Sequence, residues 1–531
     1  MISSTIVAGK VYTGSQVLGA DERAISSGVP SIELMENAGR LCVLKIKMVF
    51  GCLYGMRAAI FCGKGNNGGD GLVIARLLYE LGCEVRVLII SSDLNLKGDP
   101  QQNMARLQKL GVKPLLFSDD RGSITQALGN FTPDIIIDAI FGIGLSGEVQ
   151  GLHRSVIDQI NELAADLKQK NSSGLPMVVS IDSPSGIDSN TGKIFGLAVK
   201  ADMTITFSGY KYGLFNQPGA SYAGRIVLAD VGVDEKFMPE SNIFYTTSSG
   251  VKDSLKPRLQ YGHKGDFGTI LMVAGSYGMA GAAALAAKAA FLGGAGLVRV
   301  VLPSSIYPVV SALTPEATYL PVSGRNEKFL DHECIYRVMD EVSSSDVVLI
   351  GPGLGREKET GVLVRDLIKS IDKPFILDAD GIYALAENID TILEKKARCV
   401  LTPHPGELSR LIGNKIPYEK RLEINRDFAV NFKLISVLKG SRTLITSEIG
   451  DTFINLTGNH GMATGGSGDV LAGLIASLIG QGNDLFISAV AGTYLHGLSG
   501  DLAAEEKGTA SITALDVLNF IGSAFVKINL S

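Results

Sequence analysis

Short apolar runs alternate with amphipathic stretches along most of the chain. Apolar runs that are too short for a helix and are bounded by glycine or polar turns predict buried strands. In the first half, strands are predicted at residues 58–62, 85–90, 134–140, 177–181, 203–207 and 226–230, and helices at 72–81 and 101–110. This alternation indicates a parallel sheet covered by helices on both faces.

A stretch at residues 237–258 interrupts this alternation with polar and turn-forming residues that follow no period, which predicts a linker or domain edge. The alternation then restarts. Strands are predicted at 269–273, 298–302, 347–350, 375–378, 399–401, 435–438 and 443–446, and the last helices at 469–478 and 487–506. The chain is therefore expected to hold two α/β domains.

Composition narrows the class of protein. The net charge of −5 comes with no basic block, so neither nucleic acid nor a membrane is an expected partner. The six cysteines form no CxxC pair, the histidines show no metal-ligand spacing, and no signal peptide is recognised, so we expect a cytoplasmic protein. The uncharged stretch 267–287 is as long as a membrane span, but Gly275, Ser276 and Gly278 interrupt it. We interpret it as a strand, a turn and a small-residue helix.

Three polar, glycine-bearing segments of the first half each follow a predicted strand. They are GKGNNGGDG from Gly63, DAIFGIGLSGE from Asp138 and DSPSGID from Asp182. Ligands of open parallel sheets bind at the carboxyl ends of the strands, and a glycine turn that opens a helix offers free N–H groups to an anion. Taken singly, GxGxxG is a weak signal, and either aspartate could simply cap a helix or hold a turn. Together the three segments favour one ligand pocket.

The densest motif of the chain is GNHGMATGGSGDVLAG, which runs from Gly458 and opens an apolar helix. Its glycines and the helix N-terminus suit a nucleotide phosphate. Asp469 falls in the first helical turn, where it could be a general base or only a favourable first-turn acid. Further motifs end neighbouring predicted strands: GPGLG at 351–355, Asp378-Ala379-Asp380, TPHPGEL at 402–408 and KGSRT at 439–443. No Walker A motif occurs, so a P-loop protein is not expected.

The three segments of the first half resemble the N-terminal domain of the YjeF family, the NAD(P)H-hydrate epimerases, with a Rossmann-like three-layer α/β/α fold. The resemblance implies substrate contacts from Asn66, Asn67, Gly68, Gly69, Asp70, Gly142, Ile143, Gly144, Leu145, Ser146, Gly147, Glu148 and Asp182. It also implies a potassium ion at Asn67, Asp138 and Ser185, an oxygen-rich set that suits a hard cation. Asp182 is the expected acid/base group. Lys211 is a weaker candidate, interpreted more readily as a solvated surface lysine.

The motifs of the second half resemble the ADP-dependent NAD(P)H-hydrate dehydratases, which have a ribokinase-like fold. The resemblance implies that Gly353, His404 and Asp469 contact the hydrated nicotinamide, with Asp469 as the catalytic base and magnesium on the phosphates. It assigns ADP to Lys439, Gly440, Ser441, Arg442, Thr443, Asn459, His460, Gly461, Met462, Ala463, Thr464, Gly465, Gly466, Ser467 and Gly468. For His404, a structural role and a functional one are equally plausible from the sequence.

The resemblance covers residues 10–240 and 247–530 and implies a fused repair enzyme. The first domain would interconvert the R and S epimers of hydrated NADH and NADPH. The second would dehydrate the S form with ADP, giving NAD(P)H, AMP and phosphate, and a homo-oligomer is expected. Two alternatives stay open at this point: a ribokinase-like small-molecule kinase with an accessory nucleotide domain, and a nucleotide-sensing scaffold without turnover.

Overall fold

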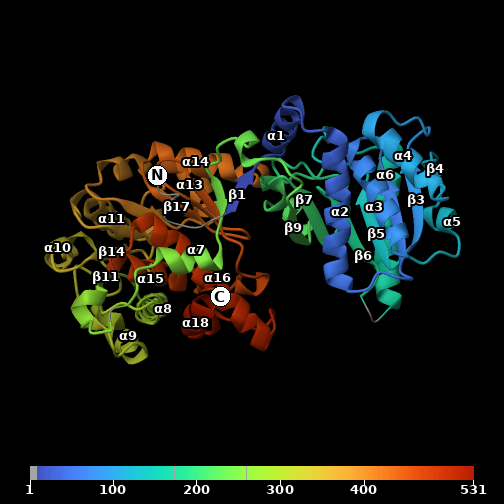
Figure 1. Ribbon diagram of the computed structural model, residues 1–531. Coiled ribbons are helices and arrows are strands. Elements are labelled where there is room, and N and C mark those ends of the chain that lie inside the picture. Colours follow the sequence, from blue (N-terminus) through green and yellow to red (C-terminus); the bar gives the residue numbers. More distant parts are fainter. Residues whose placement is uncertain (1–8, 172–173, 259, 531) are drawn as a thin grey trace. The chain divides into compact units, whose positions relative to one another are not determined.

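Two compact units make up the protein (Figure 1). The structure is a computed structural model that describes residues 9–171, 174–258 and 260–530. One unit spans Lys10–Ser241, and the other is built from Asn242–Ser531. The predicted linker at 237–258 is not without structure, because β10 (Ile243–Tyr245) and α7 (Ser248–Ser254) form within it. Both of these elements belong to the second unit, so they serve its fold and do not merely join the two parts.

The first unit is organised around a seven-stranded sheet in the order β4-β3-β2-β5-β6-β7-β9. Its strands are β2 (Arg57–Cys62), β3 (Glu84–Ile90), β4 (Leu115–Phe117), β5 (Ile135–Ala139), β6 (Met177–Ile181), β7 (Met203–Phe207) and β9 (Arg225–Ala229). Every neighbouring pair in this sheet is parallel. The predicted parallel sheet is confirmed, with β4 as a strand that the sequence pattern did not reveal.

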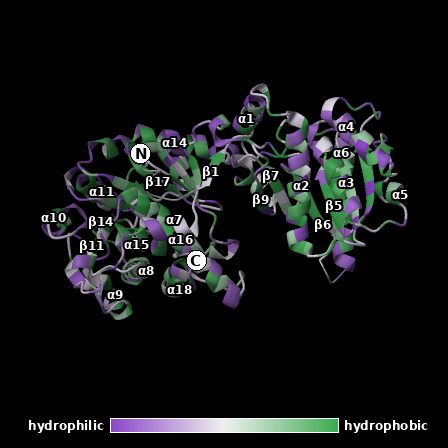
Figure 2. Cartoon of the chain, viewed as in Figure 1, coloured by the Kyte–Doolittle hydropathy of each residue, from purple (hydrophilic) through white to green (hydrophobic). Residues whose placement is uncertain are grey.

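Helices cover both faces of this sheet. Alternate residues of β2 enter different cores: Ala58 and Ile60 pack in one cluster, and Ala59 and Phe61 in the other. The first cluster includes residues of α1 (Gly14–Ser26), α2 (Ser31–Phe50), α3 (Asn66–Glu80) and α4 (Gly98–Lys109). The second includes residues of α5 (Ile124–Leu128) and α6 (Gly151–Lys170). Because both faces are buried, the central strands are apolar throughout, as the hydropathy colours of Figure 2 show.

Helix α3 begins at Asn66, six residues before the predicted start at 72, so NNGGDG forms its first turns and is not a loop. The physical reason is close packing. A Cβ at position 68 would lie 1.9 Å from the carbonyl oxygen of Gly63, and one at Gly71 would lie 2.7 Å from Cys62 Sγ. The glycines therefore let the helix start against the end of β2. Glycines that suggested flexibility in the sequence serve packing in the fold.

The second unit has a mixed sheet in the order β13-β12-β11-β14-β15-β16-β17-β18-β19-β10. Besides β10, its strands are β11 (Thr269–Val273), β12 (Leu297–Pro303), β13 (Thr318–Val322), β14 (Val347–Ile350), β15 (Phe375–Leu377), β16 (Cys399–Leu401), β17 (Ile435–Leu438), β18 (Leu444–Thr446) and β19 (Thr452–Ile454). Pairing is parallel except for β17 with β18 and β18 with β19. The α/β class predicted for this half is confirmed.

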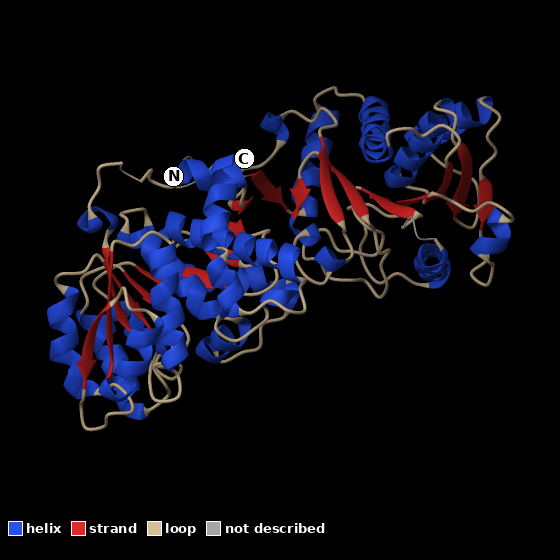
Figure 3. Ribbon diagram, turned by 90° about the horizontal axis from the view of Figure 1, so that it is seen from below, coloured by secondary structure: helices blue, strands red, loops and turns tan. Residues whose placement is uncertain are grey.

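Three apolar helices, α8 (Ala280–Leu292), α15 (Ser467–Gly480) and α16 (Leu485–Lys507), pack in one core with this sheet. Their approach is close, since a Cβ at Gly473 of α15 would lie 2.1 Å from the carbonyl oxygen of Ala286 in α8. The remaining helices of the unit are α9 (Tyr307–Leu313), α10 (Ile335–Val342), α11 (Lys358–Ser370), α12 (Asp380–Tyr383), α13 (Pro405–Ile412), α14 (Arg421–Asn431), α17 (Ala514–Asn519) and α18 (Ile521–Leu530). Figure 3 shows the strands of both units lying among helices.

The uncharged stretch 267–287 contains β11, a turn and the start of α8, as predicted. Among the described residues, every helix is too short or too polar to cross a bilayer.

Replacing Gly68 with alanine should destabilise the first unit by about 1–3 kcal/mol, because the added methyl group overlaps the Gly63 carbonyl. Gly65→Ala is the matched control, since its Cβ meets nothing within 4 Å. Chemical unfolding followed by circular dichroism measures both. Equal midpoints for the two variants would contradict the packing role of Gly68.

Two candidate active sites

The first candidate site lies where β5 and β6 end. Asp138, near the end of strand β5, is fully buried and accepts hydrogen bonds from Ser180 Oγ at 2.8 Å, Ser185 N at 2.8 Å and Ser185 Oγ at 2.5 Å. Burial raises the pKa of Asp138, and the bonds from Ser185 and Ser180 oppose that rise. The carboxyl group thus fixes the segment that follows β6 against the end of β5.

Asn67 is a buried amide beside this carboxyl group. Neither Oδ1 nor Nδ2 of Asn67 has a hydrogen-bond partner in the described part of the chain. A Cβ on Gly142 would lie 3.3 Å from Asn67 Oδ1, and the next residue back, Phe141, donates its N–H to Ser185 Oγ at 2.9 Å. Asn67, Asp138 and Ser185 are therefore gathered around one turn. A buried amide without partners costs stability, which points to a ligand.

Lys211 is fully buried, so its interpretation as a surface lysine is wrong. It lies in β8 (Tyr210–Lys211), which pairs with β1 (Gly9–Tyr12). Its Nζ donates to Asp182 Oδ1 at 2.6 Å and to the Phe207 carbonyl at 2.7 Å. Asp182 has a φ of +64°, a conformation that is uncommon outside glycine and is found at functional sites. The tyrosines that flank Lys211 in the sequence were the one signal of its burial.

Two further carboxyl groups face this ion pair. Ser208 Oγ donates to Asp21 Oδ1 of α1 at 2.9 Å. Burial raises the pKa of Asp70 well above its usual value, and the charges of Asp182 and Asp21 raise it further. Burial and these neighbouring charges therefore favour the protonated form of Asp70 beside the Asp182–Lys211 pair. Sequence reasoning missed Asp21, because it lies 187 residues from Ser208 and in no glycine motif.

The other residues predicted for this site are less enclosed. Gly68 and Gly69 are buried by packing, and a Cβ at Gly69 would lie 2.6 Å from Met35. Asn66 is exposed at the start of α3. The segment that follows Gly142 is largely at the surface, with Gly144, Ser146, Gly147 and Glu148 exposed and Ile143 and Leu145 partly buried.

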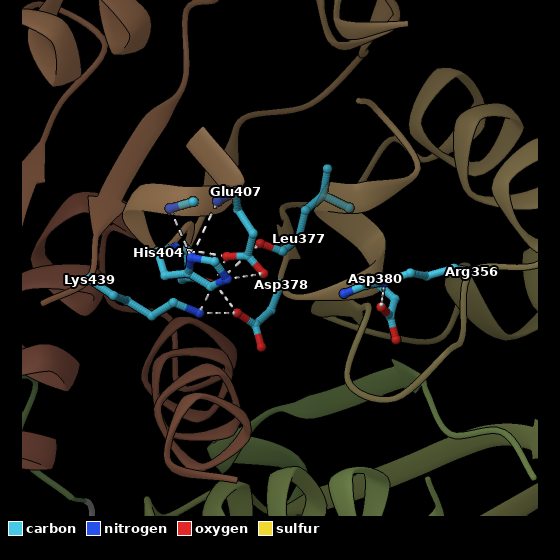
Figure 4. Close-up of polar contacts among 9 residues, drawn as sticks. Arg356, Leu377, Asp378, Asp380, His404, Glu407 and Lys439 are labelled. Carbon is cyan, nitrogen blue, oxygen red and sulfur yellow. Dashed lines mark hydrogen bonds and ion pairs between the residues drawn. The ribbon is translucent and has the colours of Figure 1, made fainter. Parts of the chain in front are cut away.

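The second candidate site gathers residues that follow β15 and β16 around Lys439, which follows β17 (Figure 4). Lys439 Nζ donates to Asp378 Oδ1 at 2.9 Å and lies 4.0 Å from Glu407 Oε2. Asp378 is buried and also accepts from Thr402 Oγ1 at 2.6 Å. Burial of Lys439 opposes its positive charge, but the carboxylates of Asp378 and Glu407 outweigh that and raise its pKa. The site therefore holds a fixed ammonium group.

Asp469 lies beside this pair in the first turn of α15. Burial raises its pKa to about 7, the Asp378 charge adds to the rise, Lys439 opposes it and Asp380 adds again. A carboxyl group with a pKa near neutrality can take up and release a proton under physiological conditions, as general acid/base catalysis requires. This geometry favours the catalytic interpretation of Asp469 over that of a first-turn acid.

His404 caps α13 with its own side chain. Nδ1 accepts the backbone N–H groups of Gly406 at 3.0 Å and Glu407 at 3.3 Å, while Glu407 Oε2 accepts the His404 N–H at 2.7 Å. Because Nδ1 is an acceptor, the ring proton of a neutral His404 sits on Nε2. The side chain is 57% exposed. His404 therefore serves the fold through Nδ1, while its Nε2 lies 3.5 Å from Glu407 Oε1.

Glycine-rich turns lie around Lys439 and Asp469. Gly466 has a φ of +90° and precedes α15, and a Cβ on Gly468 would lie 3.4 Å from Lys439 Nζ. A side chain at Gly465 would meet nothing within 4 Å, so the backbone there is open to a ligand. Gly353 has a φ of +63°, and its carbonyl oxygen accepts from Ser276 Oγ at 2.8 Å. Open N–H groups, a helix N-terminus and an ammonium group suit phosphate oxygens.

The loops of this site are held by residues outside the motifs. Buried Arg421 donates to the carbonyl oxygens of Lys439 and Ser441, each at 3.2 Å. His496 of α16 is buried, and its Nε2 lies 3.2 Å from Ser467 Oγ. Burial lowers the pKa of His496 to about 4, so it is neutral at physiological pH. Sequence reasoning missed both residues, because each lies within a helix and in none of the glycine-bearing motifs.

Not every residue assigned to ADP presents its side chain to the site. Asn459 Nδ2 donates to Gly500 O at 2.9 Å and to Asp501 Oδ1 at 3.0 Å, and Arg442 donates to Leu456 O at 2.7 Å. These two side chains shape the loops that carry the predicted nucleotide contacts. The structure brings Lys439, Gly468 and Asp469 together, with Asn459 and Arg442 as supports.

The two units thus define a class: a two-domain α/β enzyme with a polar site at the strand ends of each domain. Residues 31–213 match the family profile described as YjeF-related protein N-terminus. Residues 270–522 match the profile described as NAD(P)H-hydrate dehydratase. The bifunctional NAD(P)H-hydrate repair enzyme Nnr of Moorella thermoacetica is 39% identical over 511 residues, which are 95% of this chain and 94% of that protein. The chain belongs to the family of bifunctional NAD(P)H-hydrate repair enzymes.

Two solved structures align with about half of the chain. The ADP/ATP-dependent NAD(P)H-hydrate dehydratase of Bacillus subtilis, co-crystallised with ATP and Mg²⁺, is 29% identical and covers 54% of this chain and 98% of its own, with a TM-score of 0.46. A ribokinase-like superfamily protein of Enterococcus faecalis is 26% identical and covers 55% of this chain and 98% of its own, with a TM-score of 0.47.

Lys211→Met should destabilise the first unit by about 3–5 kcal/mol, because it leaves Asp182 buried without its ammonium partner. The matched control is Lys10→Met, which breaks the exposed pair with Glu235 and should cost under about 1 kcal/mol. Urea unfolding of both variants gives the comparison. A cost for Lys211→Met as small as that of the control would show that the buried pair is not structurally coupled.

Proposed function

We propose that this protein repairs hydrated NADH and NADPH, with residues 10–240 as the epimerase domain and 247–530 as the dehydratase domain. The first would interconvert the R and S epimers, and the second would dehydrate the S form with ADP. The observation that carries the proposal is the Asp469–Lys439–Asp378 cluster beside an open glycine turn, in a chain of this family. The other buried cluster, around Asp182, gives the protein the second site that an epimerase needs.

In the dehydratase domain, Asp469 is the base for the hydroxyl group on C6 of the hydrate. As Asp469 takes the hydroxyl proton, the oxygen attacks the terminal phosphorus of ADP, the phosphorus–oxygen bond to AMP breaks, and AMP leaves. The phosphorylated carbon then loses its phosphate while C5 loses a proton, which restores the C5–C6 double bond of the reduced nicotinamide. Lys439 neutralises charge on the transferred group, and the exposed side chain of His404 at the start of α13 contacts the substrate.

The nucleotide is proposed to bind along the glycine turn that ends in Gly468 and the loop that begins at Lys439. Magnesium would screen its phosphates during transfer. The described residues hold no cluster of three or more histidine, cysteine, aspartate or glutamate side chains that could bind a metal ion. The donors present therefore fit a magnesium ion that arrives on the nucleotide phosphates. ADP is the proposed co-substrate, although the open turn offers the same N–H groups to ATP.

In the epimerase domain, Asp182 and Lys211 are the proposed acid/base pair. Inversion at C6 requires the carbon–oxygen bond to open and re-form while a proton is moved. The 2.6 Å ion pair places a proton donor and a proton acceptor at one point, next to the Asp70 carboxyl group, whose pKa is raised by burial. Burial of Asp182 and Lys211 keeps competing water away from the reacting carbon.

The potassium site is proposed at Asn67, Asp138 and Ser185. The fit rests on the Asn67 amide, whose oxygen is buried without a partner among the described residues, and on the hard oxygens of the other two side chains. A bound cation would supply fixed positive charge near the phosphates of the substrate. The three side chains would hold it and so fix the start of α3.

Asp469→Asn should lower the rate constant of hydrate dehydration by about 10²–10⁴-fold, because the amide cannot accept the hydroxyl proton. In the unchanged protein, kcat should fall as pH falls below about 7, since protonation of Asp469 removes the base. Recovery of reduced-nicotinamide absorbance from S hydrate and ADP measures both. Epimerisation is the internal control and should not change. Full dehydratase activity in the variant would overturn this mechanism.

Asn67→Ala should raise the potassium concentration needed for half-maximal epimerisation by about 10-fold or more, because a cation ligand is lost. Asn66→Ala is the matched control, since this neighbouring asparagine is exposed. Interconversion of R and S hydrate, followed by chromatography over a potassium titration, gives the result. An unchanged titration in Asn67→Ala would rule this residue out as a ligand.

A further inference from the structure

Two arginines stack on one tyrosine in the dehydratase domain. Tyr383 ends α12 and is partly buried. The guanidinium carbon of Arg356 lies 4.8 Å from the centroid of its ring, and that of Arg410 lies 5.2 Å from the same centroid. Cation–π stacking orients a guanidinium group while leaving its N–H edge free for planar, bidentate contact with an anion. The two guanidinium groups are thus a preorganised pair of hydrogen-bond donors for an anion.

Each arginine of the pair is connected to the catalytic cluster, Arg356 through Asp380 and Arg410 through helix α13. Arg356 Nε lies 3.3 Å from Asp380 Oδ1, and Asp380 Oδ2 accepts the N–H of Gly355 at 2.9 Å. Arg410 lies on α13 one turn after Glu407, and the same helix is capped by His404. The stack therefore stands between GPGLG and the helix that presents His404. Asp380, which contacts Arg356, is also one of the charges that raise the pKa of Asp469.

Arg356 and Lys439 lie on opposite sides of Asp378 in the site (Figure 4). Lys439 and Gly468 form the side that suits the nucleotide co-substrate. The arginines therefore line the region toward which the rest of a bound dinucleotide would extend once its nicotinamide ring is at Asp469 and His404.

The positive charge of Arg356 and Arg410 is largely uncompensated by neighbouring carboxylates. The Arg356 side chain is 63% exposed and shares one carboxylate, and Arg410 is exposed and forms no ion pair among the described residues. Two oriented guanidinium groups are the donors that phosphate oxygens select.

We propose that Arg356 and Arg410, stacked on Tyr383, bind phosphate groups of the hydrated dinucleotide substrate. This inference rests on the proposed dehydratase function. Hydrated NADH carries only the diphosphate bridge, whereas hydrated NADPH carries an additional ribose phosphate. Both present the same oxygens to arginine, and a comparison of the two substrates identifies which phosphate is bound.

Arg356→Gln and Arg410→Gln each keep a polar side chain and remove the charge. Each should raise KM for the hydrate by about 10-fold, as expected for one lost charge-assisted contact, with kcat and the KM for ADP unchanged. Arg337→Gln is the control, because Arg337 is an exposed arginine elsewhere on this domain. Steady-state dehydration of S-NADH-hydrate and S-NADPH-hydrate is measured for each variant, and thermal unfolding checks that each is folded.

A rise in KM for hydrated NADPH alone assigns the arginines to the ribose phosphate, and a rise for both hydrates assigns them to the diphosphate. A rise in KM for ADP alone, or no change in any KM, overturns the proposal. NADH and NADPH carry the same phosphates as their hydrates. Measuring their binding by calorimetry therefore tests the arginine site even if the proposed dehydratase function is wrong. If the unchanged protein dehydrates neither hydrate, weaker dinucleotide binding in the arginine variants still supports the subsite, and unaltered binding rejects it.

Discussion

Buried carboxyl groups held by a lysine are the interaction on which both sites depend. Asp182 is joined to buried Lys211 in the first domain, and buried Asp378 is joined to partly buried Lys439 in the second, each by one short contact. A buried charge of this kind is costly unless its partner is fixed in place. The surrounding strands, turns and helix starts hold the lysine of each pair in place.

The same desolvation gives the neighbouring acids their chemistry. Asp70 and Asp469 lie next to these pairs, and burial raises the pKa of each, with nearby carboxylates adding to the rise. A carboxyl group in water would be ionised at neutral pH and would be a poor proton acceptor for a hydroxyl group. The fold places Asp469 where its pKa is about 7, and it places Asp70 where burial favours the protonated form. Burying these carboxyl groups thus lowers the free energy of unfolding locally but gives them pKa values that suit proton transfer.

Two domains in one chain are consistent with the chemistry that the two sites support. A dehydratase that accepts only the S epimer would leave the R form of the hydrate unrepaired, and an epimerase removes that limit. Each domain carries its site at the strand ends of its own sheet, and each uses glycines where a helix packs closely against a neighbouring element. Gly68 and Gly473 show the same constraint at two different interfaces, since a Cβ at either would overlap a backbone oxygen.

The sequence by itself determined the α/β class, nearly all the central strands and the motifs at their ends, because buried parallel strands are apolar throughout and their turns need glycine and aspartate. It also indicated Asp182 and Asp469, since both stand in glycine-bearing motifs. Only the tertiary structure decided that Lys211 is buried, that Asp21, Arg421 and His496 support the sites, and that Arg356 and Arg410 share one aromatic ring. Burial and contact between residues far apart in the chain depend on how strands and helices pack, and no local pattern records that packing.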